Sequence, residues 1–249
     1  MDILHLIVLG LLGLTGGVLS GLIGVGGGIF FVPALMLVMG WDIKEAVAVS
    51  LVIIVFSALS GTLRNLRSED PINWRVAALL ALTVAPSALI GVAISHVSSS
   101  TFVEVVFAII LLLLAYPTAR GELNLGQTQI KIPTILVLVA GIIIGALSGL
   151  VGVGGGVLMV PLMVLGMDLR TKPAVATSLA ITIFTGIVGS IGYIATGFNQ
   201  FSSIPPLVVG SVLGAWFGVH IRDYTPDKTL RTIFAIFMTI VAIRILTSL

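Results

Sequence analysis

Cysteine is absent from this chain of 249 residues, and charged side chains are scarce. Without cysteine the protein can form no disulfide bond, thiolate nucleophile or cysteine-based metal site. Asp, Glu, Lys and Arg make up only 9% of the residues, whereas a soluble domain carries about 25%. The three histidines show no metal-ligand spacing, and no nucleophile can be paired with a base. These absences predict a protein that is not an enzyme and holds no cofactor or metal.

Apolar residues dominate what remains. They account for 58% of the chain, and the mean hydropathy is +1.24, so the solvent of this protein is expected to be the lipid bilayer. The apolar segments lack period-two alternation, which favours membrane helices over a barrel. The first segment lacks a basic leader region and is interpreted as a membrane segment rather than a removed signal peptide. The predicted segments are 3–19, 29–39, 46–63, 76–94, 102–115, 132–147, 157–165, 174–195, 204–219 and 230–246.

One phrase occurs twice in the sequence. SGLIGVGGG begins at Ser20 and SGLVGVGGG begins at Ser148, an offset of 128 residues. The same offset relates Pro33 to Pro161, and AVAVSL at 46–51 to AVATSL at 174–179. A register kept over this distance indicates an internal duplication. We therefore predict a first repeat at 1–116 with a hairpin tip at 21–28, a cytoplasmic linker at 117–131, and a second repeat at 132–249 with a tip at 149–156.

Charge decides between two topologies. Segments 29–39 and 157–165 are shorter than the ~20 residues of a membrane span, so each glycine run lies either inside one broken span or at the tip of a hairpin. The first alternative gives parallel repeats and divides the basic residues evenly between the faces. The second gives inverted repeats and places ten of the 12 Lys and Arg on one face, with only Lys44 and Arg244 on the other, as the positive-inside rule requires.

The predicted fold is therefore an all-α polytopic membrane protein with two inverted-topology repeats. Each repeat contains a Gly-broken helical hairpin and three further membrane helices. The basic loops are expected in the cytoplasm and both termini outside. Basic residues confined to short loops suit a membrane face better than nucleic acid.

The two GVGGG runs suggest a binding site. Glycine in a helix costs about 1 kcal/mol relative to alanine, and a helix break leaves N–H groups that lipid cannot satisfy. Helices restarting near Ile29 and Val157 would direct partly positive N-termini at an anion, and inverted repeats would bring both to one site near the midplane. The alternative is close helix packing permitted by glycine. A Rossmann or P-loop interpretation fails, because no strand precedes the run and no Lys-Ser/Thr follows it.

Hydroxyl groups near the breaks could donate hydrogen bonds to the same anion. The alternative is that each bonds a carbonyl of its own helix. Pro33 and Pro161 are expected only to shape the short helices. Glu104, in TFVE at 101–104, is predicted to belong to a capping box at a helix start, with an external proton acceptor as the alternative. The predicted substrate-binding residues are Ser20, Gly24, Gly26, Gly27, Gly28, Ser50, Ser148, Gly152, Gly154, Gly155, Gly156, Thr177 and Ser178.

The duplicated SGLxGVGGG, each copy followed by a proline five residues after its last glycine, and the AVxxSL segments resemble the sulfite exporter TauE/SafE family of membrane permeases. The resemblance covers essentially the whole chain. It implies transport of a small sulfur-containing anion, such as sulfite or an organosulfonate, across a bacterial or archaeal plasma membrane. The paired motif is specific for the family and not for a substrate.

The functional hypothesis is a secondary transporter, and more specifically an exporter, that works by alternating access as its two halves rock about the glycine breaks. The alternatives are an anion channel, or an importer of another small organic anion coupled to a cation. The expected partners are a small anionic substrate and the lipid bilayer, without nucleic acid. The sequence leaves the oligomeric state open, a homo-oligomer included.

Overall fold

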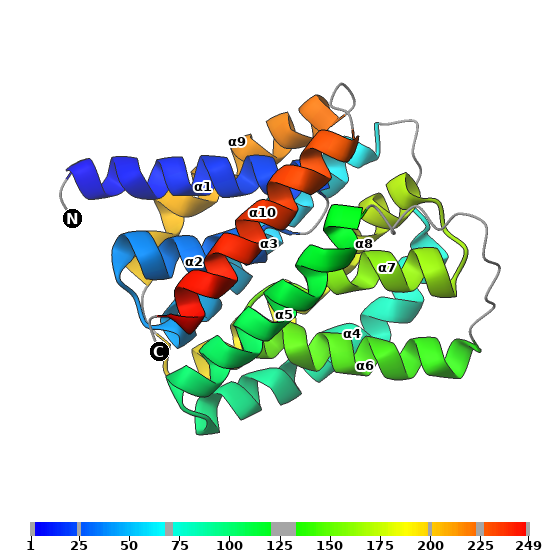
Figure 1. Ribbon diagram of the computed structural model, residues 1–249, viewed down its shortest axis with the longest axis horizontal. Helices are drawn as coiled ribbons and strands as arrows, with labels where there is room; N and C mark the ends of the chain where they lie inside the picture. The colour runs from blue at the N-terminus through cyan, green and yellow to red at the C-terminus, as the bar shows by residue number, and fades with distance from the viewer. Residues whose placement is uncertain are drawn as a thin grey trace.

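The protein folds into helices throughout the part of the chain that the structure, a computed structural model, describes. That part comprises residues 3–23, 26–67, 72–120, 133–198, 201–222 and 227–247. Within it lie ten α-helices and one short 3-10 helix (Figure 1). They are α1 (Ile3–Ile23), α2 (Gly28–Met39), α3 (Ile43–Asn65), α4 (Trp74–Val97), α5 (Ser100–Arg120), α6 (Thr134–Val151), α7 (Gly156–Gly166), α8 (Thr171–Ala195), η2 (Phe201–Ser203), α9 (Ile204–Arg222) and α10 (Asp227–Leu246).

Each predicted apolar segment corresponds to one of these α-helices, so the expectation of an all-helical polytopic protein is confirmed. Six helices within the described residues are long and apolar enough to cross a membrane: α1, α3, α4, α6, α8 and α9. Helices α2 and α7 contain 12 and 11 residues. At 1.5 Å per residue they extend about 18 and 16 Å, well short of the ~30 Å hydrocarbon core.

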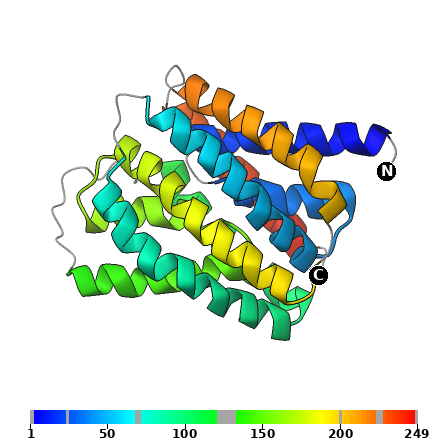
Figure 2. The ribbon, with the colours of Figure 1, turned by 180° about the vertical axis from the view of Figure 1, so that it is seen from behind.

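Helices distant in sequence pack side by side. Helix α1 packs along α9, α6 along α4, α5 beside α10, and α3 against α8 (Figures 1 and 2). All four pairs, together with the α4–α8 contact, join one predicted repeat to the other. The two predicted halves are therefore interleaved rather than lying as separate bundles.

Small residues allow the closest of these contacts. A Cβ atom added to Gly17 would meet the backbone of Ser211 and Ala215 in α9, and one added to Gly145 would meet the carbonyl oxygen of Val84 in α4. Backbones approach this closely only where glycine leaves room. The contacts advance together along each pair, so α1 runs parallel to α9 and α6 parallel to α4. The glycines that face a partner backbone in this way are Gly13, Gly17, Gly21, Gly91, Gly145, Gly149, Gly210, Gly214 and Gly218.

The helix directions place Lys44 at one end of the molecule and Arg64 and Arg67 at the other. Lys44 at the start of α3 lines one cavity with His96 at the end of α4 and Tyr193 near the end of α8. Helix α3 is therefore antiparallel to α4 and α8. At the other end of α3 the Arg64 and Arg67 guanidinium groups lie 5.3 and 6.0 Å from the centre of the Trp216 ring. Figure 1 shows the start of α1 and the end of α10 on the same side of the molecule.

Helix α5 begins earlier and ends later than the sequence predicts. The cap at the start of α5 is Ser99, whose Oγ accepts the Phe102 N–H at 3.1 Å, so the predicted capping box beginning at Thr101 is placed two residues too late. Glu104 lies in the second turn of α5 rather than in the cap. Of the predicted linker, residues 117–120 continue α5, and 121–131 lie outside the described residues.

Candidate functional site

Both glycine runs interrupt helices as predicted. Gly26 and Gly27 have φ of +77° and +83°, and Gly27 precedes the first residue of α2. In the second run Gly152, Gly154 and Gly155 have φ between +72° and +75°. Residues other than glycine rarely adopt this left-handed backbone conformation. Gly24 lies outside the described residues, and the remaining predicted glycines begin α2 and α7, at Gly28 and Gly156.

The two breaks meet at the middle of the molecule. A Cβ added to Gly26 would lie 2.7 Å from Thr182 Cγ2 and 3.1 Å from Ile54 Cγ2. A Cβ added to Gly154 would lie 2.9 and 3.1 Å from the same two atoms. Ile54 is the twelfth of the 23 residues of α3, and Thr182 is the twelfth of the 25 residues of α8. The breaks therefore share two side chains at mid-depth in the central helix pair.

Backbone contact joins the breaks as well. A Cβ on Gly28 would meet the Gly152 carbonyl oxygen and lie 2.6 Å from the Cα of Val153. Ser50 Oγ in α3 donates to the same Gly152 oxygen at 2.8 Å. Thus the start of α2 rests directly on the second break, and α3 holds that break through a buried hydrogen bond.

The first turns of α2 and α7 present backbone donors. The intrahelical bonds begin at Phe30 N, which donates to Gly27 O at 2.9 Å, and at Leu158 N, which donates to Gly155 O at 3.1 Å. The N–H groups that precede these bonds, those of residues 28–29 and 156–157, have no acceptor within their own helix. Two helix N-termini whose first N–H groups have no acceptor within their own helix are suited to an anion.

Ser20 and Ser148 lie beside these N-termini. Each is 1% exposed, and among the described residues neither Oγ has a hydrogen-bond partner. The Cβ of Ser20 is 3.1 Å from where a Cβ on Gly27 would lie, and the Cβ of Ser148 is 3.6 Å from the corresponding point on Gly155. A buried polar group without a partner costs about 1–3 kcal/mol. Equivalent orphan hydroxyls at both breaks are therefore an observation that points to a ligand.

The other predicted hydroxyls serve the scaffold. Ser178 Oγ donates to Val175 O at 2.8 Å in its own helix. Thr177 Oγ1 accepts the backbone N–H of Asn73 at 3.0 Å and so holds the residue preceding α4. Ser178 thus makes the bond to its own helix that was the alternative, Thr177 instead supports the start of α4, and Ser50 reaches across to a break.

Sequence reasoning missed Ile54 and Thr182. Thr182 Oγ1 donates to Gly154 O at 3.2 Å, and Ser57 Oγ donates to Gly26 O at 3.3 Å, so each central helix also holds one break. The repeat offset of 128 pairs Ile54 with Thr182, and this signal could have located them. Ile54 was overlooked because it carries no polar group.

Charge is absent from this region. Among the buried polar residues that the structure describes, all are Ser, Thr or Asn. No group of three metal-ligating side chains of His, Cys, Asp or Glu gathers in the same described part. Recognition at the breaks would therefore depend on backbone N–H and hydroxyl donors.

The sequence is similar to one protein family over nearly its whole length. The family profile of the sulfite exporter TauE/SafE matches residues 9–245. A probable membrane transporter protein of Bacillus subtilis, YunE, is 28% identical over 265 residues, covering 96% of this chain and 97% of the relative. YdhB of the same organism is 27% identical over 230 residues, covering 90% and 92%. A probable membrane transporter protein of Haemophilus influenzae is 27% identical over 257 residues, covering 94% and 95%.

No solved structure shows significant similarity to the chain. The family profile spans nearly the whole sequence, and the relatives named above carry the description of probable membrane transporter proteins. The glycine motifs and the helical membrane fold agree with that assignment. The chain therefore belongs to the sulfite exporter TauE/SafE family.

Proposed function

We propose that this protein is a secondary transporter of a small sulfur-containing anion, such as sulfite or an organosulfonate, which binds at the two glycine breaks. The observation that carries the proposal is the pair of buried, unpartnered hydroxyls of Ser20 and Ser148 beside the N-termini of α2 and α7. Hydroxyl and backbone donors match oxyanion acceptors without adding a fixed charge. The choice of a sulfur-containing substrate rests on the family to which the chain belongs.

We infer that α1–α5 and α6–α10 are inverted repeats in a bacterial or archaeal plasma membrane. The start of α1 lies near the end of the molecule that carries Lys44, whereas α6 starts at the opposite end together with α4. Arg64, Arg67, Arg75 and Lys172 belong to that opposite end. The positive-inside rule then assigns it to the cytoplasm and both termini to the outside.

This topology can be tested because the chain has no cysteine, so that each introduced thiol is unique. Arg67 and Thr247 are exposed residues following α3 and α10. We expect a membrane-impermeant thiol reagent to label Thr247→Cys in intact cells and Arg67→Cys only after the membrane is opened. Labelling of both thiols from the same side would contradict the inverted arrangement.

We expect the most closely packed helix pairs to move as units during transport. Because α1 interlocks with α9 and α6 with α4, each of these cross-repeat pairs is expected to move as one body against the α3–α8 centre. This refines the simple rocking of one sequence half against the other. Sub-ångström changes at a packed site are converted into such rigid-body steps because packed interfaces are bistable.

Energetics favour export. An anion leaving a cell with an inside-negative potential gains about 2.3 kcal/mol per charge per 100 mV. Export therefore needs no coupled ion, whereas uptake would need a cation or proton. Carboxylates that could carry a proton are absent from the buried polar residues of the described chain, which supports export or proton carriage by the substrate itself.

The serine pair provides the test of the binding site. We expect Ser20→Ala with Ser148→Ala to raise the KM for sulfite in reconstituted vesicles roughly tenfold, because a hydrogen bond to a charged group is worth about 1.5–3 kcal/mol. The same variant should keep or raise the melting temperature, since removing a buried orphan hydroxyl removes its desolvation cost.

Ser211→Ala is the matched control. Ser211 is also fully buried, but its Oγ bonds Val208 O at 3.0 Å in its own helix, so its loss should leave the KM unchanged. An unaltered KM in the double variant would remove the serines from the site. Counterflow of labelled sulfite distinguishes a carrier from the alternative of an anion channel, which shows no counterflow.

A further inference from the structure

A cavity lined mainly by polar residues lies at the end of the molecule opposite Arg64, Arg67, Arg75 and Lys172. It has a volume of about 230 Å³ and is lined from α3, α4, α8 and the segment after α8. Small-molecule pockets for drug-sized ligands start at about 300 Å³, so this volume suits a small ion with its water. The lining residues are Lys44, Glu45, Ser95, His96, Tyr193, Thr196, Gly197 and Phe198.

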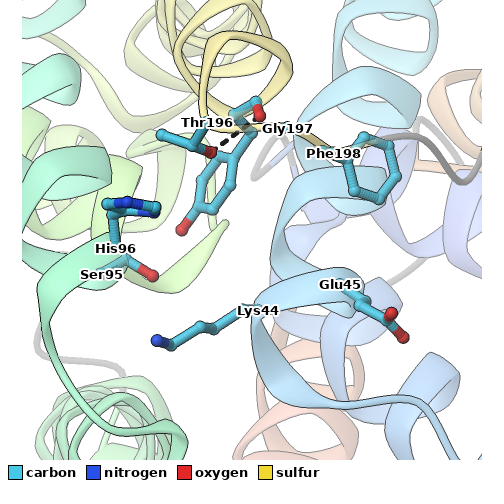
Figure 3. Close-up of a pocket in the computed structure, with 8 residues that line it drawn as sticks. Lys44, Glu45, Ser95, His96, Thr196, Gly197 and Phe198 are labelled. Atoms are coloured by element: carbon cyan, nitrogen blue, oxygen red, sulfur yellow. Dashed lines mark hydrogen bonds between the residues drawn. The ribbon is translucent and has the colours of Figure 1, made fainter.

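Lys44 directs its ammonium group across this cavity. Figure 3 shows the side chain extending from α3 toward Ser95 and His96, whereas the carboxylate of Glu45 points the other way. Lys44 Nζ donates to the carbonyl oxygen of Ser98, the C-cap residue that follows α4. The ammonium, with three donors, therefore retains donors for a second acceptor, and Glu45 does not neutralise it at close range.

Tyr193 connects the cavity to the second glycine break. It lines the cavity, is 5% exposed, and its hydroxyl donates to Gly149 O at 3.2 Å. Gly149 follows Ser148, one of the two orphan serines. The Tyr193 side chain therefore contacts both the cavity and the helix turn that precedes the second break.

Side chains of α3 and α9 meet at the opposite end of the central helices. Arg64 and Arg67 lie over Trp216, and Arg64 Nη2 donates to His220 Nδ1 at 3.0 Å. The described residues therefore form a hollow at the Lys44 end, whereas Arg64 and Arg67 of the other end lie against α9.

We propose that the Lys44 cavity is an anion-binding vestibule on the outer side, in which the Lys44 ammonium holds a small sulfonate or sulfur oxyanion on its passage past Tyr193 between the second glycine break and the outside. The proposal rests on the proposed transport function for its route, and on the cavity itself for its anion selectivity. The two parts can be tested separately.

Anion selectivity is measured by thiol labelling. Thr196 is exposed and lines the cavity, so Thr196→Cys places the chain's single thiol there. The probes are sulfonatoethyl methanethiosulfonate, an anionic sulfonate, and its cationic trimethylammonium analogue. The Lys44 charge raises the local concentration of the anionic reagent and lowers that of the cationic reagent. We therefore expect Lys44→Met to lower the ratio of anionic to cationic labelling rates roughly fivefold. Lys44→Arg should preserve the ratio.

Lys172→Met is the matched control. Lys172 is the second residue of α8, as Lys44 is of α3, and it is exposed at the opposite end. Its removal should leave the ratio at Thr196→Cys unchanged. A ratio that responds equally to both lysines would reflect general surface charge and would overturn the vestibule.

The route is measured by transport of sulfoacetate in vesicles. We expect Lys44→Met to raise the KM about threefold with little change in maximal rate, because a charged hydrogen bond in a wet cavity is weakened by screening. An unchanged KM in active Lys44→Met protein would overturn the route. If the wild type transports no sulfur anion but the labelling ratio still depends on Lys44, the vestibule stands and the proposed function fails.

Discussion

Gly28→Ala should abolish transport, although it adds a single methyl group. Gly28 is the first residue of α2, and its new Cβ would meet the carbonyl oxygen of Gly152, the Cα of Val153 and the Cδ1 of Ile54. Two of these three are backbone atoms, which cannot rotate away. The methyl group can therefore be accommodated only if the first break moves off the second.

We expect sulfite flux in reconstituted vesicles to fall to background and the free energy of unfolding to fall by about 1–3 kcal/mol, the usual cost of overpacking. Gly155→Ala is an instructive comparison. Its Cβ would lie 2.8 Å from Met159 Cε, the end of a flexible side chain, so the variant bears mainly the left-handed backbone strain of about 1–2 kcal/mol. It should keep measurable flux.

Gly10→Ala controls for any general effect of losing a helical glycine. Nothing lies within 4 Å of its added Cβ, so alanine should be neutral or stabilise by up to about 1 kcal/mol through helix propensity. Wild-type flux in Gly28→Ala, with Gly155→Ala more impaired, would show that contact between the breaks is not required for transport.

The repeated motif allowed the two helix breaks to be predicted from sequence. The 128-residue offset located both breaks, and three glycines in a row can interrupt a membrane helix where few other residues would. The sequence singles out Ser20 and Ser148 by their place before the breaks, and the structure buries each beside the glycine that caps the following short helix. Local chain geometry determines these relationships, because each serine lies only seven residues from the glycine it approaches.

Contacts between distant helices could not be predicted in the same way. Helix α1 packs along α9 rather than along its neighbours in sequence, and no local pattern names the partner of a helix. Thr177 shows the same limit: its motif copy suggested a ligand role, but the direction of its side chain is set by α8 and places it against Asn73. Side-chain direction depends on helix packing, which the motif does not encode.

Gly17→Leu should prevent the protein from folding stably. An added Cβ would meet the Ser211 carbonyl oxygen and lie 2.8 Å from the Ser211 Cα and 2.9 Å from the Ala215 nitrogen, all backbone atoms of α9. Leucine adds three further carbons at a site that has no room for one. Membrane helices associate largely through such close van der Waals contact, so we expect a loss exceeding the roughly 3 kcal/mol upper range of ordinary overpacking.

Thermal unfolding of the detergent-purified protein, with the monodisperse yield, measures this effect, and Gly10→Leu in the same helix is its control. Gly10 has open space at its Cβ, so leucine there adds only apolar surface suited to lipid. Because α1 and α9 come from different halves of the sequence, the clash at Gly17 separates the halves themselves. Equal melting temperatures for the two leucine variants would mean that the α1–α9 contact does not hold the halves together, and the cross-repeat pair would lose its role as a moving body.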